Sequence, residues 1–370
     1  MGKLVPAVLA VLILTVIVNA QIQKTAHNRV FLDEDYDYTE RLRVNRSVNE
    51  LLAKGLNSYK AGDYHAAATA FSNAVNLDST VFRAQHNLGV AHIHLDDYEA
   101  AVNDFRSALA LNEQSAVTWH FLGFAYYHLN QVQEATNCYL RALQLDPQSS
   151  VTWNNLGQTY LTLEKPSSAV DALNKALALD PNSVETVSGL CFAYVHLNQS
   201  EQAVSFCNKA RAGTQSFLAT YYLAWSYLQL KKYPEAIKTL QDCVRLDPLK
   251  PDTYIALAEG YYHLNQFREA VANSQKAIEL SPNSSPAYAG LGFIYFQMKK
   301  PKEAKRVLEK ALALAPKSVS ARYNLAMTCL ALKQKDCARE QYAILKTVDS
   351  GLSTQLLDLM YSSKVVRLMQ

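Results

Sequence analysis

The sequence is dominated by an internal repeat of about 34 residues, which occurs nine times in register between residues 48 and 350. Each repeat has a small residue that is followed, twelve positions later, by alanine. The small residues are Gly55, Gly89, Gly123, Gly157, Cys191, Ala224, Ala258, Gly292 and Ala326, and the alanines are Ala67, Ala101, Ala135, Ala169, Ala203, Ala236, Ala270, Ala304 and Ala338. A repeat of this length is one supersecondary unit that buries its apolar face against its neighbours. The pattern therefore predicts a stacked array instead of one compact core.

Each repeat has the features of two helices joined by a tight turn. In the third repeat, Trp119, Leu122 and Tyr126 are three and four residues apart, which places their side chains on one helix face. Turn signals such as Asn130-Gln131 stand halfway through the repeats, and five repeats end at proline, which cannot continue a helix. The small residues remove side-chain bulk where the two helices would meet. We therefore expect an all-α chain of helix–turn–helix hairpins.

The pattern resembles the tetratricopeptide repeat, whose signature combines Trp, Leu-Gly, Tyr, Ala, Phe or Tyr, Ala and Pro at fixed offsets. The third repeat matches every position, with Trp119, Leu122-Gly123, Tyr126, Ala135, Tyr139, Ala142 and Pro147. The resemblance implies an α-solenoid, a right-handed superhelix of nine repeats over residues 48–350. Helical spacing of the apolar residues Leu352, Leu356, Leu359 and Met360 predicts a capping helix and tail in residues 351–370. The fifth repeat is one residue short and ends in Arg211-Ala212-Gly213-Thr214, so we expect an irregularity in the stack there.

The N-terminal residues differ in composition from the repeats. Lys3 precedes an apolar run over residues 4–18, and the tripeptide Val18-Asn19-Ala20 has the small residues of a cleavage site. The run is shorter than the ~20 residues that span a bilayer, so residues 1–20 are predicted to be a cleaved secretory signal. The alternative is an uncleaved membrane anchor formed by residues 4–18. In both cases the repeats are expected to be exported, to the periplasm or cell envelope or as a secreted protein.

Residues 21–47 form a polar and acidic leader. Its acidic residues are interleaved with two tyrosines, in the order Asp33, Glu34, Asp35, Tyr36, Asp37, Tyr38 and Glu40. One interpretation is a solvated linker. The other is a segment that docks on a partner or in the groove of the protein itself.

The sequence lacks known catalytic and phosphate-binding motifs. It has no phosphate-binding glycine loop, no His-Glu-x-x-His and no Gly-x-Ser-x-Gly, and the repeats leave no segment for a catalytic domain. We therefore predict a protein that is not an enzyme, with no catalytic residues, cofactor or metal site. Of the six cysteines, Cys329–Cys337 and Cys191–Cys207 are the two plausible disulfide pairs, and simple packing is the alternative for Cys191 and Cys243.

The charge balance disfavours nucleic acid as a partner. The net charge is +3, and we interpret the Lys and Arg residues as spread through the repeats without a basic stripe. Binding to phosphates requires clustered positive charge. A membrane is expected to be a partner only if the N-terminal segment is uncleaved.

The family resemblance implies that the first helix of each repeat lines a concave groove, with repeat positions 2, 5, 6, 9, 12 and 13 directed inward. Carried over to this sequence, these positions give an aromatic and amide-rich lining that suits an extended peptide. The predicted groove residues are Asn87, Phe124, Tyr127, Asn154, Asn155, Phe192, Tyr222, Trp225, Tyr262, Phe293, Phe296 and Asn324. For each aromatic ring, packing on a neighbouring helix is the alternative. The clamp that binds chaperone tails in some members of the family is absent, since only Asn87 matches it.

We therefore expect a scaffold or adaptor that binds a peptide or protein segment in its concave groove. The alternative function is structural, as a self-associating component of an envelope or extracellular assembly. The sequence does not identify the partner.

Overall fold

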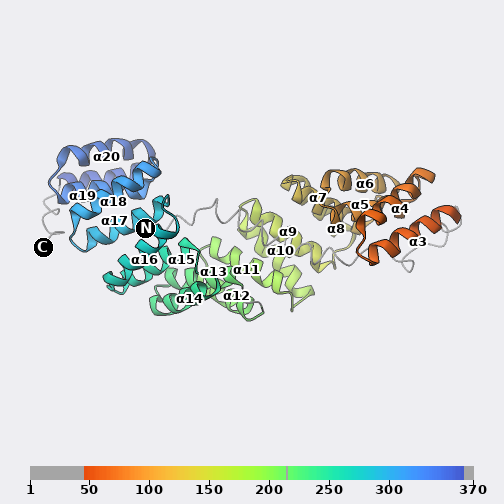
Figure 1. Cartoon of the computed structure of the whole chain (residues 1–370), viewed down its shortest axis with the longest axis horizontal. Coiled ribbons are helices and arrows are strands. Elements are labelled where there is room, and N and C mark those ends of the chain that lie inside the picture. The colour runs from red at the N-terminus through yellow and green to blue at the C-terminus, as the bar shows by residue number, and fades with distance from the viewer. Residues whose placement is uncertain (1–45, 214–215, 362–370) are drawn as a thin grey trace. The chain divides into compact units, whose positions relative to one another are not determined.

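The computed structural model describes residues 46–213 and 216–361, and every regular element in these ranges is an α-helix. Within each of the two units described below, consecutive helices pack against each other (Figure 1). The prediction of an all-α solenoid built from tetratricopeptide hairpins is therefore confirmed. The predicted signal or anchor (residues 1–20), nearly all of the acidic leader, residues 214–215 and the tail after residue 361 lie outside the described residues.

The described residues divide into two compact units, one that ends at Asn198 and one that begins at Gln199. The division falls in the turn of the fifth repeat, the repeat in which the sequence predicts an irregularity. In the first unit, four hairpins are followed by the first helix of the fifth repeat. The helices are α3 (Arg46–Lys60), α4 (Tyr64–Leu77), α5 (Phe82–His94), α6 (Tyr98–Leu111), α7 (Ala116–His128), α8 (Val132–Leu145), α9 (Ser150–Thr162), α10 (Pro166–Leu179) and α11 (Val184–His196).

The second unit begins with the other helix of the fifth repeat. Four hairpins and a final helix follow it. The helices are α12 (Ser200–Gly213), α13 (Phe217–Gln229), α14 (Tyr233–Leu246), α15 (Pro251–His263), α16 (Phe267–Leu280), α17 (Ser285–Gln297), α18 (Pro301–Leu314), α19 (Val319–Ala331), α20 (Lys335–Val348) and α21 (Ser350–Tyr361). No helix in the described part of the chain has the length and apolar character needed to cross a bilayer.

The small residues of the repeat lie where the two helices of a hairpin are closest. A Cβ atom built at Gly55 would lie 2.4 Å from the ring of Phe71, and one built at Gly157 would lie 2.5 Å from Leu173. Both distances are shorter than real Cβ contacts allow, so only glycine fits against these large side chains. All nine alanines of the second helices are fully buried. The repeated small residues therefore mark the points at which the two helices of a hairpin pack closely.

The turn inside each hairpin has the same backbone conformation throughout. One residue adopts a positive φ, between 55° and 79°, at Gly62, Asp96, Asn130, Glu164, Asn198, Lys231, Asn265, Lys299 and Lys333. In the second repeat, the amide of Asp97 donates to the carbonyl of His92 (3.0 Å) and the amide of Asp96 to that of Ile93 (3.1 Å). This is a Schellman motif, which satisfies the last carbonyls of the first helix.

Hydrogen-bonding side chains fix the start of most first helices. Ser115 and Ser149 cap α7 and α9 by accepting the backbone N–H three residues ahead. The indole N–H groups of Trp119 and Trp153 each donate to a carbonyl six residues upstream, at 2.9 Å. The Tyr254 hydroxyl and the Arg322 guanidinium make the equivalent bond. Other donors therefore replace tryptophan in repeats that lack it.

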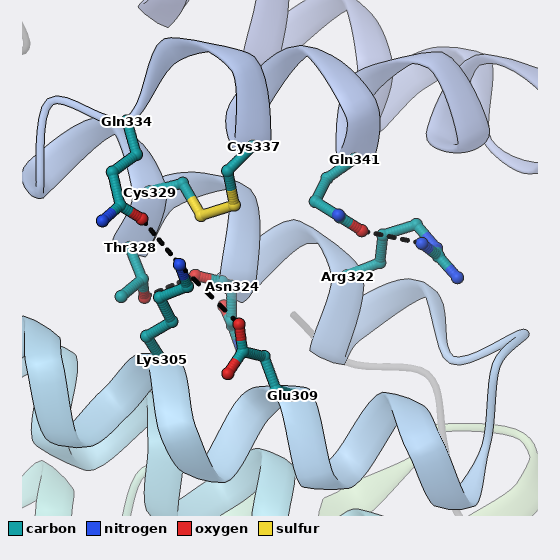
Figure 2. Close-up of a disulfide and its surroundings, with 9 residues drawn as sticks. All are labelled: Lys305, Glu309, Arg322, Asn324, Thr328, Cys329, Gln334, Cys337 and Gln341. Atoms are coloured by element: carbon teal, nitrogen blue, oxygen red, sulfur yellow. Dashed lines mark hydrogen bonds and ion pairs between the residues drawn. A yellow bond between two sulfur atoms is a disulfide. The ribbon is translucent and has the colours of Figure 1, made fainter.

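The last hairpin is held by bonds between α19 and α20. A disulfide joins Cys329 to Cys337, which was one of the two pairs that the sequence suggested (Figure 2). Nη1 of Arg322 donates to Oε1 of Gln341 at 2.7 Å. Beyond it, Leu356 of α21 is fully buried in a cluster with Leu345 of α20.

The remaining cysteines differ in their state. Cys191 and Cys207 lie in different units, so their pairing stays a prediction. Cys138 and Cys243 are free and buried, and burial raises the pKa of both thiols to about 12. These two thiols are therefore protonated and unreactive at neutral pH.

Candidate functional site

The twelve predicted groove residues separate into two groups by exposure. Seven are buried, and six of these belong to the first unit: Asn87, Phe124, Tyr127, Asn154, Asn155, Phe192 and, in the second unit, Tyr222. The other five are half-buried and all belong to the second unit: Trp225, Tyr262, Phe293, Phe296 and Asn324. The sequence predicted a groove lining at all twelve positions, with packing as the alternative for each ring, and the structure shows the first group buried. Contact with a partner stays a prediction for the second group.

Asn154 belongs to a ladder of hydrogen bonds between successive first helices. It accepts a bond from the Thr186 hydroxyl at 3.2 Å. His86 and His120, at the same repeat position, bond Thr118 and Thr152, each at 2.9 Å. Asn154 was predicted to face a peptide. All three side chains instead connect neighbouring repeats, because position 5 of one first helix lies beside position 3 of the next.

Asn87 and Asn155 share the next repeat position and are more deeply buried, with 1% and 2% of their surface exposed. The Asn87 amide makes no hydrogen bond with a described residue, and the Asn155 amide lies near the hydroxyl of the buried Tyr139. Both asparagines were predicted to line the groove, and the structure buries them. Burying an amide without a partner costs about 1–3 kcal/mol, so Asn87 is expected to lower the stability of the first unit.

The aromatic positions of the first unit are filled by ring packing. Phe124 is 1% exposed, and its ring centroid lies 4.5 Å from that of His128 at the end of α7. His128 also stacks on Tyr98 of the preceding hairpin, at 4.5 Å. Burial lowers the pKa of His128 to about 4, so the ring is neutral at pH 7. In the first unit, the predicted aromatic groove residues are therefore buried by packing, which was the alternative to a peptide contact.

The second unit has an aromatic row that remains half-buried. We define the row as Trp225 of α13, Tyr262 of α15, and Phe293 and Phe296 of α17. The rings of Tyr262 and Phe293 meet edge to face with centroids 5.0 Å apart, which connects the row between the seventh and eighth repeats. Asn324 of α19 extends it by one repeat.

A carboxylate within this row was missed by the sequence argument. Glu259 occupies in the seventh repeat the position that Trp225 and Phe293 hold in the sixth and eighth. It is half-buried, and burial raises the pKa of its carboxyl group. Glu259 forms no ion pair with a described residue. Its register in the repeat marks it as a lining position, whereas the predicted lining contained only aromatic rings and amides.

The described residues offer no metal site, because they hold no group of three or more potential ligands in a suitable arrangement. One acid–base pair occurs, between Nδ1 of His92 and Oδ2 of Asp104 at 2.6 Å. It joins α5 to α6 inside one hairpin. The hydrogen bond that Asp104 accepts from His92 raises the pKa of His92, and the pair links the two helices of the hairpin.

Comparison with sequence models of protein families gives two matches. Residues 33–289 match the family described as Cilia and flagella-associated protein 70 C-terminal domain, and residues 263–343 match Anaphase-promoting complex, cyclosome, subunit 3. The first match covers more than half of the chain. Comparison with curated proteins finds no match.

Solved structures support the fold alone, since their sequences are distant. The chain resembles the APC/C hetero-tetramer Cut9-Hcn1, with a TM-score of 0.51 and 14% identity over 88% of this chain and 98% of that one. It also resembles the C-terminal part of a TPR repeat-containing protein from Cytophaga hutchinsonii. The TM-score there is 0.52, with 18% identity over 66% of this chain and 99% of the other.

Proposed function

Because the chain belongs to the tetratricopeptide repeat family described as Cilia and flagella-associated protein 70 C-terminal domain, we propose that it is a non-enzymatic scaffold that binds a peptide segment of a protein partner on the first helices of its second unit. Proteins with these repeats generally mediate protein–protein interactions. The proposal goes further by assigning the contact to the aromatic row.

The half-buried state of the aromatic row is the observation that carries this proposal. In the first unit the equivalent positions are closed by packing, whereas Trp225, Tyr262, Phe293 and Phe296 keep part of their ring surface open. Rings that are anchored in a core and partly exposed offer apolar area at little entropic cost, and Trp and Tyr are enriched among the residues that dominate interfaces.

Glu259 supports a narrower choice of peptide. Its carboxylate lies in register between two aromatic positions, and a Lys or Arg side chain would meet both an opposite charge and ring faces there. We propose that the bound segment carries a basic residue at this point. The Glu259→Gln variant is then expected to bind basic peptides about tenfold more weakly, with little change for neutral ones.

Selection from a random peptide library on the full chain tests the proposal. Affinity is then measured by fluorescence anisotropy for the wild type and for Trp225→Ala with Phe293→Ala. Loss of two such rings is expected to weaken binding at least tenfold. The control is Tyr288→Ala, which removes a half-buried ring from another face of α17. Equal affinities in all three proteins, or loss in the control alone, would rule out the row as the binding surface.

The N-terminal segments add a proposal on location. We propose that the repeats are exported and that the signal in residues 1–20 is cleaved, on the basis of the apolar run and the small residues that follow it. N-terminal sequencing of the protein from its native host tests this. A chain that begins at Gln21 supports cleavage, and one that retains residues 4–18 in the membrane fraction supports the anchor instead.

A further inference from the structure

A glycine of α17 borders an open space beside the aromatic row. Gly290 is half-buried, yet a Cβ atom built on it would meet no other part of the chain within 4 Å. Gly189 of α11 holds the same repeat position, and a Cβ atom there would lie only 2.6 Å from Nε2 of Gln158 in the preceding repeat. Glu259 occupies in the seventh repeat the position that Gln158 has in the fourth. The first pair therefore identifies Glu259 as the side chain that faces Gly290.

The two pairs differ in whether the space beside the glycine is filled. Glutamine and glutamate side chains are almost equal in size, and Gln158 is buried and covers Gly189. Glu259 is half-buried and leaves Gly290 uncovered. A carboxylate costs more free energy to bury than an amide unless a cation neutralises it. Burial raises the pKa of Glu259, with no contribution from a cation among the described residues. The site therefore combines an unneutralised carboxyl group with room for a cation.

Aromatic rings lie on both sides of this space along α15. One turn beyond Glu259, the ring of Tyr262 meets that of Phe293 on α17 with centroids 5.0 Å apart. One turn before Glu259, the core cluster that includes Ala256 packs against the half-buried ring of Trp225 on α13. Packed helices lie about 8–10 Å apart, so a cation between α15 and α17 is within the range of about 6 Å over which ring faces attract it.

The hydrogen-bonding groups around the space indicate which cation fits it. A lysine ammonium has three N–H donors and an arginine guanidinium has five, and each donor that leaves water needs an acceptor. Of the side chains that border the space, Glu259 and Tyr262 carry oxygen atoms and the others are rings without polar atoms or, for Trp225, with a donor only. A trimethylammonium group keeps the positive charge, has no donor to satisfy and presents methyl groups to ring faces. The surroundings therefore favour an alkylated ammonium over an unmodified one.

We propose that the space between Glu259 and Gly290 binds the trimethylammonium group of a trimethylated lysine in the partner peptide. The Glu259 carboxylate balances the charge of this group, and the ring faces of Tyr262, Phe293 and Trp225 contact its methyl groups. This assignment rests on the peptide site proposed above and narrows its basic residue to a methylated one. All of the residues involved belong to the second unit.

Tetramethylammonium chloride tests the space without a peptide. Its titration into the full chain should give a saturable NMR shift of the Trp225 indole N–H that sodium chloride does not give. Gly290→Leu fills the space and should abolish this shift, and Glu259→Gln should weaken binding about tenfold. Glu269→Gln is the control, since it removes an exposed carboxylate of α16 in the same unit and should bind like the wild type. Thermal unfolding checks that the variants are folded, and a wild type without a saturable shift overturns the site.

Peptides selected from a library with trimethyllysine fixed at one position test the source of the cation. Each is made again with lysine, or with a neutral tert-butyl group in place of the trimethylammonium, and the affinities are compared by fluorescence anisotropy. The trimethylated form should bind about tenfold more tightly than either of the others. Equal or tighter binding of the lysine or tert-butyl form overturns this assignment and leaves the peptide site standing. If no peptide binds the aromatic row, the proposed function fails as well, whatever the tetramethylammonium result.

Discussion

Two glycines in α17 separate the effect of close packing from that of helix propensity. A Cβ atom at Gly292 would lie 2.5 Å from Leu308, whereas one at Gly290 would meet nothing within 4 Å. Gly290→Ala is therefore expected to stabilise the protein by about 0.5–1 kcal/mol. Gly292→Ala is expected to destabilise it by about 1–3 kcal/mol through overpacking. Denaturant midpoints check both values, and a gain in stability from Gly292→Ala would contradict the packing argument.

Adjacent asparagines in α9 offer a second contrast at the scale of residues. Asn154 bonds Thr186, and its replacement by Ala should cost about 1 kcal/mol. The Asn155 amide lies near the Tyr139 hydroxyl but makes no hydrogen bond of normal geometry, so Asn155→Leu removes a buried amide of similar volume and should be neutral or stabilising. Thermal unfolding of both variants measures the difference. Equal destabilisation by the two changes would show that the Asn155 amide is satisfied in solution.

At the scale of elements, the ring stacks between hairpins predict how stability depends on pH. Burial lowers the pKa of His128 to about 4 in the folded state, from 6.5 in the unfolded chain. The unfolded chain therefore binds the proton first, and the stability that a neutral His128 provides above pH 6.5 is lost as the pH falls toward 4. His128→Phe keeps a ring against Tyr98 without the titration.

Unfolding of the wild type and His128→Phe between pH 7 and pH 4 measures this effect. The free energy of unfolding of the variant should rise relative to that of the wild type as the pH falls. A stability difference that stays constant over this range would mean that His128 is not held neutral by its surroundings.

The disulfide between α19 and α20 gives a prediction about the last hairpin. The two cysteines are eight residues apart, and closing a loop of this size is worth about 2–3 kcal/mol in the chain-entropy account. Cys329→Ser with Cys337→Ser should therefore speed hydrogen exchange in α19, α20 and α21. The first unit should be unaffected, because repeats couple mainly to their neighbours. Reductant should not change exchange in α19, α20 and α21 of the double variant. Faster exchange throughout the chain of the double variant would contradict local coupling.

The helices and turns could be predicted from the sequence because each depends on the chemistry of neighbouring residues. The alanine set marked every close crossing, and Asn130-Gln131 and its equivalents marked the turns. The exposure of each side chain could not be predicted. The repeat position gives the direction of a side chain, but it does not show how closely the first helix of the next repeat covers it. Phe124 and Trp225 share one position, yet only Trp225 stays half-buried. Glu259 was overlooked although its register was visible.

For the whole molecule, the two units have different characters. The first unit closes its inner positions with rings, hydrogen-bonded His and Thr side chains and buried amides. The second unit keeps the aromatic row half-buried and adds a carboxylate to it. A scaffold of uniform repeats would distribute contacts along its length, and this chain instead offers the open ring surface in its sixth to eighth repeats.

Hydrogen exchange of the full chain, with and without a peptide selected for binding, tests this division most directly. Added protection is predicted in α13, α15 and α17, with α5, α7 and α9 unchanged. Protection that appears on the first unit, or on the second helices of the hairpins only, would contradict the assignment of the binding surface to the aromatic row.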